Sequence, residues 1–287
     1  MSNAAFGRRI DTGTVLMVPV ALLLLAGFFV PIVIVAIYSL MPSRSFGLST
    51  DFTVANYETA FLDGYWLPLA WSALGAFLTT AICLLLAWPT AKALDRFAGR
   101  WATIATLLIA LPIFISESVR LFGLSLFMMP GGGILAGSLE AAFGVSIGTI
   151  LNTRLAALIG LVYIHFPFVL FPLLLGFSQV PRDQAEAARD LGATPWQVFR
   201  EIELPLTAPG ATIGVLLCFV LSLGANAEMS ILGGQAVTVI ARAIEQRFNY
   251  AQDWPLGAAL TMLVIVLTAL VVLPLIKRID LDRLIRR

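Results

Sequence analysis

Histidine, cysteine and charged side chains are scarce in this chain of 287 residues. It has one histidine, His165, two cysteines, and only 12% charged residues. One histidine and two isolated cysteines cannot make a His–Cys metal cluster or a Ser-His-Asp catalytic triad. We therefore expect no metal site and no catalytic residues. Cys83 and Cys218 both lie inside apolar runs, where a small hydrophobic packing role is the usual one.

The charges that are present balance almost completely. The chain has 18 Lys and Arg residues against 17 Asp and Glu residues, which gives a formal net charge of +1. This balance provides no basic field that would attract a nucleic acid. The basic residues stand at the edges of long apolar runs instead of forming a patch. We therefore exclude nucleic acid as a partner.

Long apolar runs dominate the rest of the sequence. The apolar fraction is 59% and the mean hydropathy is +0.93, which is too high for an ordinary soluble core. The first run lacks a clear small-residue cleavage site and is too long for a signal peptide, so we expect it to be retained. The sequence predicts an all-α integral membrane protein. Its six transmembrane helices are expected where runs approach the ~20 residues that a bilayer requires, at 13–38, 67–90, 102–127, 154–178, 207–229 and 257–276.

The distribution of Lys and Arg predicts the orientation of these helices. Only Arg44, Arg242 and Arg247 occupy the loops 39–66, 129–153 and 230–256, whereas 13 basic residues occupy the segments 1–12, 91–101, 179–206 and 277–287. Because cytoplasmic loops are enriched in basic residues, both termini are expected in the cytoplasm. The predicted organisation is a cytoplasmic N-terminal segment (1–12), a transmembrane domain (13–276) and a cytoplasmic tail (277–287).

The polar segment 179–206 lies between two apolar runs and has the signals of two short helices. In the first, Asp183 and Glu186 have the spacing of an N-cap and its acidic partner, so a start near Gln184 is expected. Gly192 is suited to end this helix, because glycine takes a positive φ without steric cost.

The second helix of the segment has a start signal in Thr194, Pro195 and Gln197, as N-cap, first and third helical residues. Pro205 is expected to stop it. An apolar face is formed by Trp196, Phe199 and Ile202, while Arg200, Glu201 and Glu203 point largely elsewhere. Two interpretations of this face stay open, namely contact with lipid headgroups and docking to a protein.

Ionisable residues within or near the predicted spans are costly to place there; they are Glu117, Arg120, His165 and Glu228. Glu117 and Arg120 either pair along one helix face or line a solute path. His165 is expected to donate a hydrogen bond in helix packing. Glu228 is either a solvated helix terminus or part of an outer gate. If the solute is an amine, Glu228 with Asn226 is the better candidate to contact it, and Tyr163 offers a ring face for a cation–π contact.

A spaced motif runs through the polar segment: Glu186-Ala187-Ala188, then Gly192, Ile202 and Leu204-Pro205. With this spacing the chain resembles the membrane permease subunits of binding-protein-dependent ABC importers. The resemblance implies that the segment forms a coupling helix that sits in a groove of a cytoplasmic ATPase. It assigns this coupling role to Glu186, Ala187, Ala188, Gly192, Ala193, Thr194, Pro195 and Trp196.

Further stretches resemble the spermidine/putrescine branch of this family, namely "NYETAF", "LVYIHFPFVLFPLLLGF", "EIELPLTAPG" and "QDWPLGAAL". The stretch "LGANAEMSILGG" departs from that branch, because Ala225 occupies a position that is usually acidic. Glu228 lies three residues later and can face the same side of a helix turn. The resemblance implies import of a polyamine or a similar amine-containing compound, with an opine, an aminophosphonate or another small solute as alternatives.

The resemblance also implies the partners. They are an ATP-binding cassette ATPase dimer, a second and distinct permease subunit, a periplasmic solute-binding protein and the lipid bilayer of a bacterial inner membrane. The chain has no Walker-type nucleotide site, so we expect it to bind no cofactor, and ATP and Mg²⁺ to be used by the ATPase. An ion-coupled secondary transporter is the alternative class. It predicts inverted repeats with discontinuous helices, and the two halves of the sequence show no convincing repeat.

Overall fold

The computed structural model describes residues 12–47, 51–96, 99–129, 133–144, 150–234, 236 and 238–277, which form helices and their connections without a strand. Except for Thr12 and Lys277, the predicted N-terminal segment and C-terminal tail lie outside these residues. In chain order the elements are α1 (Thr12–Ser39), α2 (Ala55–Leu62), α3 (Trp66–Arg96), α4 (Arg100–Ala110), the 3₁₀ turn η1 (Leu111–Phe114), α5 (Glu117–Met128), α6 (Ile134–Phe143), α7 (Arg154–Phe177), α8 (Arg182–Asp190), α9 (Pro195–Val198), the π-turn η2 (Phe199–Glu203), α10 (Leu204–Leu223), α11 (Ala227–Ile231), α12 (Ile240–Asn249) and α13 (Trp254–Ile276).

Five described helices are long and apolar enough to cross a bilayer, and they match five of the six predicted runs. They are Met17–Ser39, Trp66–Arg96, Arg154–Phe177, Pro195–Leu223 and Trp254–Ile276. The fifth predicted run, 207–229, needs correction at both ends. Its helix begins at Pro195 and ends at Leu223, so Glu228 lies beyond the span, in α11.

The third predicted run, 102–127, is a broken helix rather than one continuous span. The stretch Arg100–Phe114 is followed by Glu117–Met128 at an angle of 104°. Between them Ile115 and Ser116 have extended backbone, with ψ of 137° and 134°. Proline disrupts a helix because it has no N–H and its ring crowds the preceding turn. Pro112 lies in η1, where the α-helix gives way to a 3₁₀ turn three residues before the extended Ile115.

The chain divides into two compact units, Met1–Asp63 with Gln246–Leu263, and Gly64–Glu245 with Val264–Arg287. In the first unit, buried Asp253 accepts hydrogen bonds from the Ser43 hydroxyl (2.9 Å) and the Arg44 backbone N–H (3.2 Å). Buried Asn56 donates to the carbonyls of Ser39 (3.0 Å) and Met41 (2.7 Å). These polar contacts hold the connection that follows α1.

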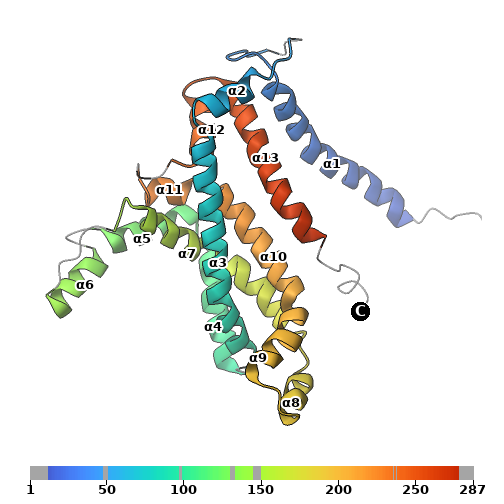
Figure 1. Cartoon of the computed structure of the whole chain (residues 1–287), viewed down its shortest axis with the longest axis vertical. Helices are drawn as coiled ribbons and strands as arrows, with labels where there is room; N and C mark the ends of the chain where they lie inside the picture. Colours follow the sequence, from blue (N-terminus) through green and yellow to red (C-terminus); the bar gives the residue numbers. More distant parts are fainter. Residues whose placement is uncertain are drawn as a thin grey trace, which may run out of the picture. The chain divides into compact units, whose positions relative to one another are not determined.

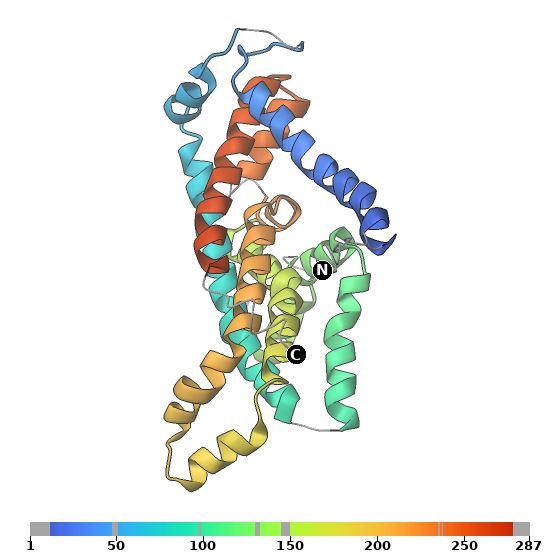
Figure 2. The same cartoon turned by 90° about the vertical axis from the view of Figure 1, so that its right-hand side faces the viewer.

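In the second unit, α3, α7 and α10 lie side by side (Figures 1 and 2). Both cysteines are free and buried among these helices, as the sequence predicts for packing residues. The buried cluster at this place consists of Cys83, Ala87, Ala91, Val169, Leu170, Leu173, Phe177 and Cys218. Small residues are prominent in it because helices in a bilayer associate through close van der Waals packing.

Glycine allows α7 and α10 to approach at backbone distance. A Cβ atom at Gly210 would stand 2.3 Å from the carbonyl oxygen of Pro172 and 3.2 Å from the Cα of Gly176. A Cβ atom at Gly214 would stand 3.0 Å from the Cα of Val169. Because no larger residue fits at Gly210 without moving a backbone, the two helices are held in one register.

Candidate functional site

The motif-bearing segment forms a helical hairpin, α8 and α9, at one end of the α3, α7 and α10 bundle (Figures 1 and 2). The first helix begins earlier than the sequence predicts. Its N-cap is Pro181, α8 starts at Arg182, and Asp183 lies in the first turn and not at the cap. Pro181 has an extended backbone, with φ −65° and ψ 123°. The fixed φ of proline suits this position, and no side chain caps the helix.

The end of α8 is the glycine turn that the sequence predicts. Gly192 has φ +86°. Its N–H donates to the carbonyl of Arg189 at 2.9 Å, and the N–H of Ala193 donates to the carbonyl of Ala188 at 2.9 Å. This pair of bonds is a Schellman motif, which satisfies the last carbonyls of a helix. The turn therefore gives the hairpin one defined geometry.

The start of α9 is the predicted capping box. The Thr194 hydroxyl accepts from the backbone N–H of Gln197 at 3.3 Å, and the Gln197 side chain accepts from the backbone N–H of Thr194 at 2.7 Å. Pro195 occupies the first helical position. Both ends of the connection between the two helices are thus fixed by local hydrogen bonds.

Pro205 does not stop the second helix, contrary to the prediction. The chain continues through η2 into α10, so that Pro195–Leu223 is one long helix. In η2 the N–H of Leu204 donates to the carbonyl of Phe199, five residues back. A π-turn inserts one residue into the helix, and Pro205 follows it in the first turn of α10, where an N–H is not required.

The hairpin presents two large apolar side chains to its surroundings. Leu191 is 91% exposed and Trp196 is 65% exposed. Motif residues Glu186, Ala187 and Gly192 are exposed as well, while Ala188 and Ala193 are half-buried. Sequence reasoning missed Leu191, although its place directly before the turn glycine is the signal that could have found it. An exposed apolar pair on a rigid hairpin is suited to contact another surface.

An aromatic row joins the hairpin to the bundle. The ring of Trp196 stacks on Phe199 (5.2 Å between centroids), and Phe199 contacts Trp88 of α3 at 5.4 Å. Trp88 in turn contacts Phe177 at the end of α7, also at 5.4 Å. Of the predicted apolar face, Phe199 and Ile202 are thus partly covered, while Trp196 stays exposed.

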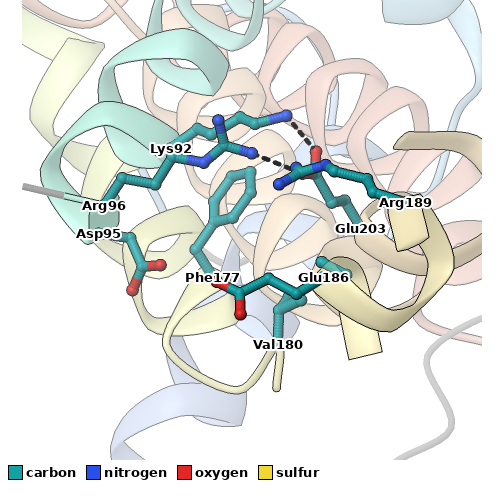
Figure 3. A pocket seen from close by; sticks show the side chains of 9 residues that line it. Lys92, Asp95, Arg96, Phe177, Val180, Glu186, Arg189 and Glu203 are labelled. Carbon is teal, nitrogen blue, oxygen red and sulfur yellow. Dashed lines mark hydrogen bonds and ion pairs between the residues drawn. The ribbon is translucent and has the colours of Figure 1, made fainter. Parts of the chain in front are cut away.

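Glu203 is buried, which corrects the prediction that it points away like Arg200 and Glu201. Its carboxylate accepts from Lys92 Nζ at 2.5 Å and from Arg96 Nη2 at 3.3 Å (Figure 3). The side chain is 5% exposed. Glu203 is the last residue of the π-turn η2, whose side chains do not follow the spacing of an α-helix.

A pocket of about 270 Å³ opens beside this ion pair (Figure 3). α3 contributes Lys92, Asp95 and Arg96 to its wall, and α8 contributes Glu186 and Arg189. Side chains of both signs therefore meet where the hairpin adjoins the end of α3.

A second charged site gathers the four ionisable residues that the sequence singled out: Glu117, Arg120, His165 and Glu228. We call them the charged cluster. They come from α5, α7 and α11, which pack through apolar residues including Leu121, Ile164 and Leu232. His165 is 4% exposed and Glu228 is 2% exposed. His165 Nδ1 lies 3.9 Å from Glu228 Oε1, and the charges of Glu117 and Arg120 act on both residues.

Within this cluster the predicted Glu117–Arg120 pair does not form. No salt bridge joins the two described side chains, and Arg120 Nε and Nη1 are buried without a hydrogen-bond partner. Glu117 is exposed in the first turn of α5, where the helix dipole favours an acid. His165 Nδ1 donates to the Leu161 carbonyl at 2.9 Å, so the bond that it donates lies within α7 and not between helices.

The remaining path candidates are Asn226 and Tyr163. The Asn226 amide donates to the Glu245 carboxylate at 2.6 Å, which ties α11 to α12. Tyr163 is 41% exposed. Among the described residues, no group of three or more His, Cys, Asp and Glu side chains is arranged to hold a metal ion.

Comparison with known proteins agrees with this architecture. The chain is 31% identical over 221 residues to a spermidine/putrescine transport system permease protein, PotB, of Haemophilus influenzae, with 77% of each chain covered. It is 31% identical over 223 residues to PotB of Escherichia coli, covering 77% of this chain and 81% of that one. A bacterial ABC transporter involved in alginate import has the same fold, with a TM-score of 0.71, 16% identity and 95% of each chain covered.

The family assignment follows from a match over most of the chain. Residues 83–286 match the model of the binding-protein-dependent transport system inner membrane component. This stretch includes the hairpin, the aromatic row and the charged cluster. The chain is thus a multi-pass inner membrane protein and the permease subunit of an ABC importer, and it belongs to the family of binding-protein-dependent transport system inner membrane components.

Proposed function

We propose that the α8–α9 hairpin couples this permease to a cytoplasmic ATPase. The observation that carries the proposal is that two local hydrogen-bond motifs fix the shape of the hairpin. They are a Schellman motif at Gly192 and a capping box at Thr194. Closure of a soluble ATPase dimer can move a membrane bundle only through a stiff contact of defined shape. Exposed Leu191 and Trp196 supply the apolar part of that contact, and Glu186 offers a carboxylate to a basic partner.

The remaining subunits follow from the same proposal. The ATPase dimer binds ATP and Mg²⁺, and this chain binds neither. A second, distinct permease subunit completes the membrane pathway, and a periplasmic solute-binding protein delivers the solute. One alginate importer of the same fold was solved in complex with a periplasmic protein that holds an alginate pentasaccharide. In this assembly the hairpin and both termini face the cytoplasm.

We further propose that the solute is a polyamine or a similar amine-containing compound. The PotB relatives support this proposal, since two of them are 31% identical over 77% of this chain. Glu228 also supports it, because a cation that crosses low-dielectric surroundings needs a compensating carboxylate. An opine or an aminophosphonate is the alternative, and the buried, unpartnered N–H groups of Arg120 favour it, since they suit an anionic group.

The coupling proposal is tested with Glu186→Ala and Gly192→Asp in the assembled importer. Gly192 has open space around it, so the cost of a side chain is the strain of its left-handed backbone, about 1 kcal/mol or more. We expect either change to lower uptake at least about five-fold, with expression unchanged. Gly64→Asp is the matched control, because Gly64 also has positive φ (78°) and open space. Near-normal uptake by both hairpin variants would refute the coupling role.

A further inference from the structure

We propose that Glu203 is the positioning residue that passes movement of the hairpin to α3. The inference rests on the proposed coupling function and extends it to a contact outside the hairpin. We call Glu203 with Lys92 and Arg96 the Glu203 latch. The latch joins positions 107 and 111 residues apart in the chain.

Because its carboxylate is buried, Glu203 requires the two cations of the latch. The Glu203 side chain is 5% exposed, whereas those of Lys92 and Arg96 are 28% and 52% exposed. A carboxylate removed from water is strongly disfavoured unless a cation and hydrogen bonds compensate it. Glu203 therefore depends on its α3 partners, while the two cations retain some contact with water. Glu201, two residues earlier, is exposed and has no such dependence.

The backbone of Glu203 is fixed as firmly as its side chain. Glu203 is the last residue of η2, and its carbonyl accepts a hydrogen bond of 2.7 Å from the fully buried Thr207 hydroxyl in α10. One residue thus has its main chain held by α10 and its carboxylate held by α3. A displacement of α9 that reaches η2 must move both spans or break the latch.

The aromatic row is a second contact between the hairpin and α3, and it complements the latch. Trp88 lies one turn before Lys92 on α3 and packs between Phe177 and Phe199. The row resists compression between the hairpin and α3, because close-packed side chains transmit strain. The latch resists separation of the same elements, since pulling Glu203 away would leave a buried charge unpaired. The two contacts together transmit motion in both directions, which alternating access requires.

The experiment measures solute transported per ATP hydrolysed. The importer is assembled with its ATPase and second permease subunit in proteoliposomes and supplied with the solute-loaded binding protein. We expect Glu203→Gln and Lys92→Gln to lower this ratio at least about five-fold, while the ATPase still co-purifies in the wild-type proportion. Glu203→Asp keeps the charge and should recover most of the ratio. Glu201→Gln is the matched control and should leave the ratio unchanged.

A purely structural role for Glu203 predicts a different result. The variants would then lose thermal stability or yield, and the surviving complexes would transport the normal amount of solute per ATP. That outcome would overturn the latch. If Glu203→Gln does not accumulate in the membrane, the ratio measured for Lys92→Gln is the test. This variant leaves Glu203 paired with Arg96, so we expect it to fold. A normal ratio in the latch variants together with uncoupling by Glu186→Ala would refute the latch and leave the coupling role of the hairpin standing.

Discussion

The backbone contact between α7 and α10 predicts that a single methyl group at Gly210 will destabilise the protein. In Gly210→Ala the new Cβ would stand 2.3 Å from the Pro172 carbonyl oxygen and 3.2 Å from the Gly176 Cα. Both neighbours are backbone atoms, which cannot rotate away as a side chain can. Relief therefore requires the two helices to separate or slide.

The size of the effect follows from these distances. Non-bonded atoms of this kind rest at about 3.5 Å, so the helices must move by about 1 Å at this point. Overpacking of this kind costs about 1–3 kcal/mol. Alanine also favours a helix over glycine by up to about 1 kcal/mol. The free energy of unfolding should accordingly fall by up to about 3 kcal/mol relative to the wild type, and by about 1–3 kcal/mol relative to a helical Gly→Ala variant that creates no close contact.

The assay is an unfolding titration with SDS in detergent micelles, followed by circular dichroism. Gly123→Ala is the matched control, because Gly123 lies in helix α5 and a Cβ there meets nothing within 4 Å. This control should be as stable as the wild type or up to about 1 kcal/mol more stable. If Gly210→Ala is as stable as Gly123→Ala, α7 and α10 are not held at the distance described here.

Two further predictions concern topology and the solute. The charge bias predicts that a cysteine at position 200 stays unreactive to an impermeant maleimide in intact cells and that one at position 140 is modified; reversed labelling would overturn this orientation. For a cationic solute, Glu228→Gln should lower uptake in reconstituted vesicles at least several-fold while ATP hydrolysis persists. Arg120→Gln should be the damaging change if the solute is anionic, and no effect of either variant would place the solute path on other residues.

Features set by neighbouring residues could be predicted from the sequence. The glycine turn at Gly192 and the capping box at Thr194 depend on residues within five positions, and both are present. The five continuous apolar spans could also be predicted, because their length and composition identify them. The clearest local error, the stop at Pro205, arose because a π-turn can remove the conflict that proline creates in a helix.

Features that depend on distant partners could not be predicted. Nothing near Glu203 in sequence distinguishes it from Glu201, and only the packing of α3 against η2 buries one and exposes the other. For the charged cluster, the residues could be predicted but their assembly could not. Its four residues were recognised as costly in a membrane, but their assembly on α5, α7 and α11 depends on the break after Phe114.

That break also bears on the number of times that the chain can cross the membrane. At about 1.5 Å per residue, Arg100–Phe114 reaches about 22 Å and Glu117–Met128 about 18 Å, and each falls short of the ~30 Å hydrocarbon layer. Because the two axes meet at 104°, their lengths do not simply add, and neither piece crosses this layer alone. Five continuous helices alone make an odd number of crossings, which would leave the two ends of the chain on opposite sides.

If both termini lie in the cytoplasm, as we propose, the number of crossings is even, so the chain between α3 and α7 must supply one crossing in addition to the five continuous helices that the structure describes. In that proposed orientation, the side on which every later segment lies depends on this additional crossing, to which Arg100–Phe114 and Glu117–Met128 contribute. A chain that lost this crossing would carry Glu203 and the hairpin to the membrane face opposite Lys92 and Arg96, so the latch could not form.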